Sequence, residues 1–441
     1  MPIDDAMRRA RAMEQDAMAQ SGPLVGYRVL DLGSTVAGPF CARLLADFGA
    51  EVVKVEDIGG DPVRELGEKA DGKSLYAATI LRNKKIIAID LRKEEGRDLV
   101  RRLVPHFDVV VENFRPGTLE KWSLGYEDLC KLRRDLIMTR ISGFGQSGPM
   151  TQRPGYGVIG EAMSGLREMI GEPDRPPSRV GLPLTDYITA VYAAFGTAMA
   201  IAHRHRTGQG QCIDAALYEA AFSFMEAAVP AYEKTGKVAK RAGSRLPNSA
   251  PNSLYPTRDG KYIHIAALAD QVYRRLTKAM GKPELGTDPR FATQEPRARN
   301  VDEVDEIVTA WTSSLDLAEI EQKLEVADVP ASRIFTMSDI FGSAHYASRN
   351  MLVTVPDDDL GSVTQAGIVP KLSATPGRVC WSGHRNGQDT REILRCFLDM
   401  PDADVDRLES AGVVRCDRDA GQSSGNSSSE PNSNLARKAG T

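Results

Sequence analysis

The order of apolar and polar positions divides the chain into regions of different periodicity. From Gly26 to about Arg140, short β-branched runs alternate with segments of helical periodicity. The predicted strands are Arg28–Leu32, Val52–Val55, Ile86–Ile89, Val109–Val111 and Ile137–Ile141, and the predicted helices between them include Pro39–Phe48, Lys93–Val104 and Tyr126–Arg133. This alternation predicts an α/β fold, an open and mostly parallel sheet with helices on both faces.

The pattern also predicts a second, smaller domain. A linker over 235–251, rich in Gly, Ser, Asn, Pro and basic residues, follows the first part of the large domain at 23–234. The small α+β domain is expected over 252–344 and opens with a hairpin that turns at Asp259-Gly260. Short strands and terminal helices return over 345–416. We predict a flexible N-terminus over 1–22 and, from its Ser/Asn/Gly-rich composition, a disordered tail over 417–441.

Composition and charge narrow the classes of function. A chain of 441 residues exceeds what one core usually supports, and 41% apolar with 26% charged residues is typical of soluble globular proteins. The net charge of −4 shows no basic bias, so neither nucleic acid nor an anionic membrane is expected as the main partner. No apolar run approaches the roughly 20 residues that span a bilayer. The six cysteines lack CxxC or metal-ligand spacing, which favours a cytoplasmic protein without a metal site.

Asp186 is the most informative single residue. A segment interrupted by Gly and Pro precedes Asp186, so this carboxylate lies at the N-terminus of a long apolar helix, predicted from Asp186 to about His203. One interpretation is an N-cap, in which Asp186 or Thr185 accepts a hydrogen bond from the first free amides of the helix. The other is a nucleophile, because the positive helix end favours a charged carboxylate and can stabilise an oxyanion. The local sequence does not decide between the two.

A family resemblance favours the nucleophile over the N-cap for Asp186. Several sequence blocks, in order along the chain, carry this resemblance. The blocks are Val29–Pro39, Leu44–Glu56, Asn83–Lys85, Val111–Gly117, Gly143–Pro149, Val180–Ala190, Arg206–Gln211 and Leu372–Pro376. Together they resemble the class III CoA-transferases, the family of formyl-CoA and carnitine CoA-transferases. The resemblance implies that Asp186 is the catalytic aspartate. It also implies a set of CoA-binding residues, Val36, Ala37, Arg92, Asn113, Phe114, Lys121 and Tyr156.

The resemblance further implies an architecture and a reaction. We expect a homodimer of two interlocked ring-like chains, with 345–416 rejoining the large domain and the active site between the domains. The enzyme would move CoA between an acyl-CoA and a small carboxylic acid, with an aspartyl anhydride and an aspartyl-CoA thioester on Asp186 as intermediates. Coenzyme A is then a substrate, and no cofactor is expected. A dicarboxylic acid such as succinate is our first candidate for the acid, because Arg153 or Arg245 could pair a second carboxylate.

One departure from the family and three alternative interpretations were considered. The stretch Gly243–Ser249 lacks the oligoglycine run with which some relatives shield the anhydride, which argues against a close formyl-CoA transferase. The related acyl-CoA racemases have a histidine where this chain has Tyr156, and tyrosine is a poor base near neutral pH. A racemase is therefore the alternative, and a noncatalytic CoA-binding protein is a third hypothesis. The GxGxxG match at Gly143–Gly148 does not predict nicotinamide binding, because Pro154 would break the required helix.

Overall fold

The structure, a computed structural model, describes residues 21–417 as two compact units, which are presented one at a time. The first unit comprises 21–154, Thr189–Ala216 and 353–417, and the second comprises Gly155–Ile188 and Leu217–Leu352. The second unit includes the whole of the predicted small domain and further segments on either side of it. The boundaries expected at 234, 252 and 344 stay predictions. Most of the predicted flexible N-terminus and disordered tail lies outside the described residues.

A seven-stranded sheet forms the centre of the first unit. Its strands are β1 (Arg28–Asp31), β2 (Glu51–Glu56), β5 (Lys84–Ile89), β6 (Val109–Glu112), β7 (Ile137–Ser142), β8 (Cys212–Ala216) and β14 (Val414–Arg415). The order is β14-β5-β2-β1-β6-β7-β8, and every pair is parallel except β14 with β5. The predicted parallel strands and the mostly parallel α/β fold are confirmed, and the region after 345 supplies β14 to this sheet.

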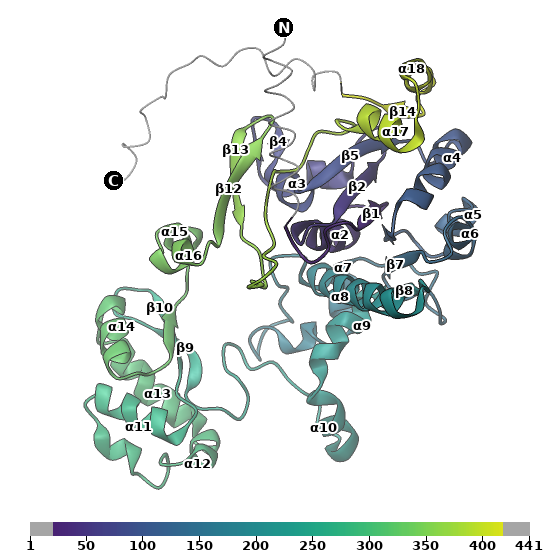
Figure 1. Cartoon of the computed structure of the whole chain (residues 1–441). Coiled ribbons are helices and arrows are strands. Elements are labelled where there is room, and N and C mark those ends of the chain that lie inside the picture. Colours follow the sequence, from purple (N-terminus) through teal and green to yellow (C-terminus); the bar gives the residue numbers. More distant parts are fainter. Residues whose placement is uncertain (1–20, 418–441) are drawn as a thin grey trace, which may run out of the picture. The chain divides into compact units, whose positions relative to one another are not determined.

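Helices cover both faces of this sheet (Figure 1). They are α2 (Ala37–Asp47), α3 (Leu75–Ile80), α4 (Glu94–Leu103), α5 (Thr118–Lys121), α6 (Tyr126–Leu132), α8 (Leu184–Thr207), α17 (Thr390–Leu398) and α18 (Asp402–Ser410). Alternate strand residues such as Leu30, Val53 and Ile87 enter one core with apolar residues of α4, α17 and α18. The strands carry β-branched residues on both faces because both faces are covered, as in parallel sheets generally.

Helix α2 lies on the opposite face from α4 and α17 (Figure 1). Helix α8 contacts the sheet through Thr197, whose hydroxyl lies 2.7 Å from that of Thr139 on β7. Among the described residues, α8 is also the one helix long and apolar enough to cross a membrane by composition. Its 24 residues run further than the predicted Asp186–His203. In its apolar window 44% is buried, and Thr197 anchors the helix on β7.

Two lysine–aspartate pairs are buried between the sheet and α2. Lys84 Nζ lies 2.8 Å from Asp31 Oδ2, and both side chains are 0% exposed. Lys84 also donates to the carbonyl of Pro39 in the first turn of α2, at 2.6 Å. Lys54 Nζ lies 3.1 Å from Asp61 and donates to the carbonyl of Gly33. A charge removed from water requires such partners. These pairs therefore hold the loop between β1 and α2 against the sheet.

The same loop contains a residue in an unfavourable backbone conformation. Thr35 has φ of 67°, in the left-handed region that β-branched residues rarely adopt. Asp61 holds it there by accepting a hydrogen bond from the Thr35 amide at 3.0 Å. Burial opposes ionisation of Asp61, but Lys54 and the amides of Val63 and Thr35 outweigh it and lower the pKa of the carboxyl. The charged form of Asp61 therefore anchors a loop that would otherwise relax.

The remaining elements complete the two units. In the first unit are two hairpins and two 3-10 helices: β3 (Lys69–Ala70), β4 (Lys73–Ser74), β12 (Leu352–Asp357), β13 (Gly361–Ala366), η1 (Pro62–Glu65) and η2 (Val104–His106). In the second unit are α7 (Gly157–Met163), α9 (Leu217–Phe222), α10 (Ala228–Thr235), α11 (Asp270–Ala279), α12 (Gln294–Arg299), α13 (Val301–Thr312), α14 (Leu317–Val326), α15 (Met337–Phe341), α16 (Ala344–Ser348), β9 (Asn252–Pro256), β10 (Tyr262–Ala266), β11 (Ala331–Arg333), η3 (Arg167–Met169), η4 (Ser223–Met225) and η5 (Pro283–Gly286). Strands β9 and β10 form the predicted hairpin, and β11 extends it into a three-stranded antiparallel sheet.

The buried pairs lead to a stability prediction. Lys84→Met should lower the free energy of unfolding by about 3–5 kcal/mol, because Asp31 then keeps a buried charge without its cation. The double variant Lys84→Met with Asp31→Asn should lose less than the single variant, since no net charge stays buried. Urea unfolding followed by circular dichroism measures both. Lys69→Ala, which breaks an exposed pair with Glu65, is the control and should change stability by less than about 0.5 kcal/mol. An equal loss in the double and single variants would contradict this account of the pair.

Candidate active site

The strand order places a ligand-binding edge between β1 and β6. From β1 the chain builds outward through β2 to β5, and it then returns to place β6 on the other side of β1. Open α/β sheets bind ligands at the carboxyl ends of strands where the order reverses in this way. Val36 and Ala37 follow β1, and Asn113 and Phe114 follow β6. The topology therefore brings four of the predicted CoA-binding residues to this one edge.

Asn113 connects the two loops at this edge. Its Oδ1 accepts a hydrogen bond from the Ser34 amide at 2.7 Å, and its Nδ2 donates to the Ser34 carbonyl at 2.9 Å. Gly38 packs closely against it, since a Cβ there would lie 3.1 Å from Asn113 Cγ. Both ends of the Asn113 amide are thus engaged with the loop after β1. Its predicted contact with CoA stays a prediction, and the observed contribution is to shape the loop.

The N-terminus of α2 presents backbone to this edge. The side chains of Val36 and Ala37 are buried, at 6% and 2% exposure, and no side chain caps the helix. The first amides of an α-helix have no partner within the helix, and they carry its positive dipole end. Any ligand contact of Val36 and Ala37 would therefore be made mainly by backbone groups, which suits an anion.

A cavity of about 220 Å³ opens at the same edge. Phe114 forms an aromatic wall with Trp122, edge to face with ring centroids 5.5 Å apart. Arg92 borders the cavity and is 65% exposed, but its guanidinium already pairs with Asp90 at 2.7 Å and Asp57 at 3.0 Å. A phosphate at Arg92 would compete with these carboxylates. The combination of an aromatic wall and a polar rim is typical of small-molecule sites.

Two further cations lie on the connection after β6. Lys121 and Arg115 are exposed, and within residues 21–417 neither side chain has an ion-pair or hydrogen-bond partner. Lys121 was among the predicted CoA-binding residues. Arg115 was not, although it directly follows Asn113 and Phe114, because an arginine at a loop tip is usually only solvated surface. Both are available to an anion, unlike Arg92.

Asp186 lies inside the first turn of α8, which begins at Leu184. The N-cap interpretation is therefore wrong for this residue, because an N-cap precedes the first helical residue and the run Leu182-Pro183 already supplies that entry. Burial raises the pKa of Asp186 to about 6, and the opposing influences are its own backbone amide and the charge of Arg179. A carboxylate that is partly dehydrated yet ionised near neutral pH is suited to nucleophilic attack.

Gly157 holds the Asp186 carboxylate at close range. Gly157 is the first residue of α7, and a Cβ placed on it would lie 1.8 Å from Asp186 Oδ2. No other residue type fits there without displacing the carboxylate. Tyr156, another predicted CoA-binding residue, immediately precedes Gly157, and its side chain is 77% exposed. The second unit thus brings together Asp186, Gly157 and the backbone of Tyr156. The sequence had not indicated Gly157 or Arg179 as residues of this region.

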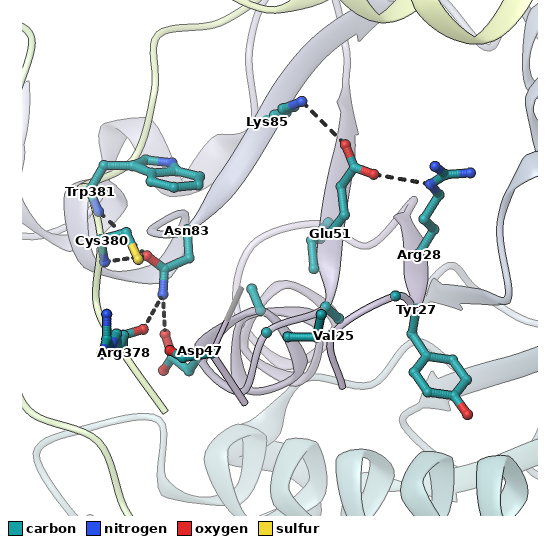
Figure 2. Close-up of a pocket in the computed structure, with 16 residues that line it drawn as sticks. Val25, Tyr27, Arg28, Asp47, Glu51, Asn83, Lys85, Arg378, Cys380 and Trp381 are labelled. Atoms are coloured by element: carbon teal, nitrogen blue, oxygen red, sulfur yellow. Dashed lines mark hydrogen bonds and ion pairs between the residues drawn. The ribbon is translucent and has the colours of Figure 1, made fainter. Parts of the chain in front are cut away.

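A second cavity in the first unit, of about 500 Å³, lies elsewhere. It is lined by the amino-terminal ends of β1, β2 and β5, the edge opposite the loops described above. Figure 2 shows that its polar side chains face one another. Glu51 pairs with Arg28 and Lys85, and Asn83 bonds Asp47 and the Arg378 carbonyl. Of these two cavities, the smaller one is our candidate for ligand binding in the first unit, because its position at the carboxyl ends of the strands follows from the strand order.

Comparisons with known proteins identify the family of the chain. Residues 24–390 match CoA-transferase family III. The chain belongs to this family of enzymes. It is 48% identical over 394 residues to a succinyl-CoA–D-citramalate CoA-transferase of Chloroflexus aurantiacus, covering 89% of this chain and 98% of the relative. It is 35% identical to a succinate–glutarate CoA-transferase of Agrobacterium fabrum, covering 84% and 95%. A CaiB/BaiF family structure from Brucella suis matches with a TM-score of 0.77 at 33% identity, covering 86% and 100%.

The family membership settles the class of protein. The resemblance seen in the sequence blocks is confirmed, and so is the expectation of a CoA-transferase. The hypothesis of a noncatalytic CoA-binding protein is wrong, because the family and the relatives named above are CoA-transferases. Of the two arginines considered for a substrate carboxylate, Arg245 is already paired with Asp302 and Asp305, both at 2.7 Å, while Arg153 is exposed. No cluster of three metal-ligating side chains occurs in the part of the chain that the structure describes.

The Gly157 contact leads to a prediction. Gly157→Ala should lower kcat/KM for CoA transfer by about 100-fold, because displacing a reacting group by about 1 Å has effects of that size. Steady-state assay with thioester product detected by mass spectrometry measures it. Gly181→Ala is the matched control, since a Cβ at that position meets nothing within 4 Å. Activity of Gly157→Ala close to wild type would show that the Asp186 carboxylate tolerates displacement.

Proposed function

We propose that this enzyme transfers CoA from a dicarboxylic acyl-CoA such as succinyl-CoA to a second small carboxylic acid, through covalent intermediates on Asp186. The observation that carries the proposal is the Asp186 carboxylate itself. It is largely buried at the start of a long helix, in contact with Gly157, and its pKa is raised to about 6. A group held in this way loses solvation that would otherwise blunt its nucleophilicity, yet it is still ionised at neutral pH.

The chemistry conserves the thioester bond through four exchanges. An Asp186 oxygen attacks the thioester carbonyl, the C–S bond breaks, and CoA leaves as the thiolate with its electron pair. The thiolate attacks the aspartyl carbonyl of the mixed anhydride, which releases the donor acid and leaves aspartyl-CoA. The acceptor carboxylate displaces CoA from Asp186, and the thiolate then attacks the acyl carbonyl of the acceptor and frees Asp186. No proton has to be removed by a base, which fits a site without a Ser–His or Cys–His pair among its identified residues.

CoA is proposed to bind at the carboxyl edge of the sheet. The aromatic wall at Phe114 suits the adenine ring, and the uncommitted cations Lys121 and Arg115 suit the phosphates. Val36 and Ala37 would contribute amides at the start of α2, and Tyr156 would act beside Gly157. Arg92 enters only by exchanging Asp57 or Asp90 for phosphate. No cofactor besides the substrate CoA is required by this chemistry.

The choice of a dicarboxylic acid rests on the relatives. The C. aurantiacus enzyme is named for succinyl-CoA and D-citramalate, and the A. fabrum enzyme for succinate and glutarate, and all of these acyl groups and acids are dicarboxylic. The racemase alternative is not favoured by any observation here. Tyr156 occupies the position of the racemase histidine, and its side chain is highly exposed. An exposed phenol has little tendency to remove a carbon-bound proton near neutral pH.

We further propose a homodimer, interlocked as the family resemblance implies. Helix α8 supports an association surface, because Val191, Tyr192, Phe195 and Met199 are each 43–60% exposed along it. Contiguous exposed apolar side chains usually mark an interface. A second copy of this chain is the occupant that the resemblance supplies.

Replacing the nucleophile tests the proposal directly. Asp186→Ala should lower the rate of CoA transfer by about 10⁴-fold or more, with CoA affinity nearly unchanged, because the covalent route is removed and the carboxyl edge of the sheet is not altered. Wild-type enzyme turning over in hydroxylamine should yield a hydroxamate at Asp186, identified by peptide mass spectrometry. Near wild-type transfer by Asp186→Ala would falsify the assignment.

The raised pKa of Asp186 predicts two pH effects of opposite sense. The value of kcat/KM should rise through about pH 6 and level off above it, because only the ionised carboxylate attacks. Stability should show the reverse, since the folded state favours the protonated form: the contribution of Asp186 is full below its unfolded pKa and is lost as pH rises through about 6. At pH 8, Asp186→Asn should therefore be more stable than wild type by about 1–3 kcal/mol, measured by urea unfolding, and at pH 4 the difference should shrink. A difference that is the same at both pH values would contradict the raised pKa.

A further inference from the structure

Two carboxylates hold Arg92, and they differ in how firmly they are fixed. Asp90 is 5% exposed, and its Oδ1 accepts hydrogen bonds from the Arg92 amide at 3.0 Å and from Arg92 Nε at 2.7 Å. Asp57 pairs through its Oδ2 with Arg92 Nη2 at 3.0 Å, and its side chain is 46% exposed. An exposed ion pair contributes little free energy, because water and dissolved ions compete for both partners. Asp57 is therefore the partner that an incoming anion can replace.

The pair lies at the proposed nucleotide site. Asp57 and Arg92 line the same cavity of about 220 Å³ as Phe114 and Trp122. In the proposed function, the aromatic wall of this cavity holds the adenine of CoA, whose ribose carries phosphate groups. A guanidinium binds phosphate best through two parallel hydrogen bonds. The Nε and Nη2 groups of Arg92 that would form them are occupied by Asp90 and Asp57.

The loop after β2 restricts the position of Asp57. The Gly59 amide donates to Asp57 Oδ1 at 2.9 Å, and the Gly60 amide donates to the Asp57 carbonyl at 2.8 Å. Asn386, in the connection that precedes α17, also donates to the Asp57 carbonyl, at 3.3 Å. The backbone and one carboxylate oxygen of Asp57 are thus held in place. A phosphate bound to Arg92 would lie beside this carboxylate, and like charges at such short range repel each other.

We propose that Asp57 sets the affinity of this enzyme for acyl-CoA by competing with a CoA phosphate for the guanidinium of Arg92. The inference rests on the proposed function and identifies a residue that opposes binding at the same site. Before CoA binds, Asp57 pairs with Arg92. When CoA is bound, the phosphate takes the place of Asp57, which then repels it. Each reaction cycle ends with release of a CoA thioester, and a carboxylate that weakens binding favours that release.

The direction of one change in affinity tests the inference. Asp57→Asn should tighten the binding of CoA by about 3- to 10-fold in calorimetric titration, since it removes both the competing ion pair and the repulsion. Asp128→Asn is the matched control, because it breaks an exposed pair with Lys131, and neither residue lines the cavity. The control should change the Kd of CoA by less than about twofold. Weaker binding by Asp57→Asn would show that Asp57 orients Arg92 for CoA and would overturn the inference, as would an unchanged Kd.

A double variant tests whether the effect depends on Arg92. In an Arg92→Ala background, Asp57→Asn should tighten CoA binding by less than about twofold, because no guanidinium is left to be released. The same gain in both backgrounds would overturn competition for Arg92, since Asp57 would then act on CoA without it.

Phe114→Ala separates failure of the inference from failure of the proposed site. It should weaken CoA binding by about 10-fold or more, the size of a lost contact between a base and an aromatic ring. Unchanged binding in Phe114→Ala would overturn the proposed nucleotide site and the inference with it. If Phe114→Ala weakens binding and Asp57→Asn does not tighten it, the proposed site is retained and only the inference is overturned.

Discussion

The buried ion pairs between the sheet and α2 are the constraint on which the carboxyl edge depends. Lys84 and Lys54 lie on adjacent parallel strands, and each reaches a carboxylate and a backbone carbonyl near the turn between β1 and α2. Removing such charges from water is unfavourable by itself, so the arrangement is retained only where every donor finds a partner. The result is a loop with little freedom, in which even Thr35 keeps a positive φ. The Asn113 bridge can then join β1 and β6 in a single geometry.

The second unit shows the opposite use of burial. Around Lys84, a buried charge is satisfied by a close partner, whereas Asp186 is buried with only its own amide and the field of Arg179 to offset the loss of water. In the first arrangement the close partner offsets much of the cost of burying the charge, and in the second that cost is left largely uncompensated at neutral pH. Reactive groups commonly carry a stability penalty of this kind, because the interactions that would fully stabilise the charge would also quench its reactivity.

The sequence predicted the fold closely where periodicity was strong. The five strands and the helices at α2, α4 and α6 follow from β-branched runs that alternate with helical patterns, and both ends of each lie within a few residues of the observed bounds. The start of α8 was placed two residues late, because Thr185 and Asp186 are residue types that often cap a helix, whereas the helix begins at Leu184, directly after Pro183. That small shift is what distinguishes an N-cap from a residue inside the first turn.

The site was less predictable, because its residues act through space. Nothing in the order of residues indicates that Gly157 touches Asp186, that Asn113 is engaged with Ser34, or that Arg245 is already neutralised. Family resemblance pointed to Asp186 and to the two loops of the sheet edge as candidates. It could not say which cations are committed, since pairing depends on side chains brought together only by the fold.

Buried cations that are already paired and exposed cations that have no partner should respond differently to dissolved salt. Lys84 and Lys54 are shielded from solvent, so dissolved ions screen their pairs weakly. Arg115, Lys121 and Arg179 face water, where mobile ions compete with any anionic group that approaches. The ionic composition of the surroundings therefore acts on any anion bound at these exposed cations far more than on the buried pairs that hold the loop between β1 and α2.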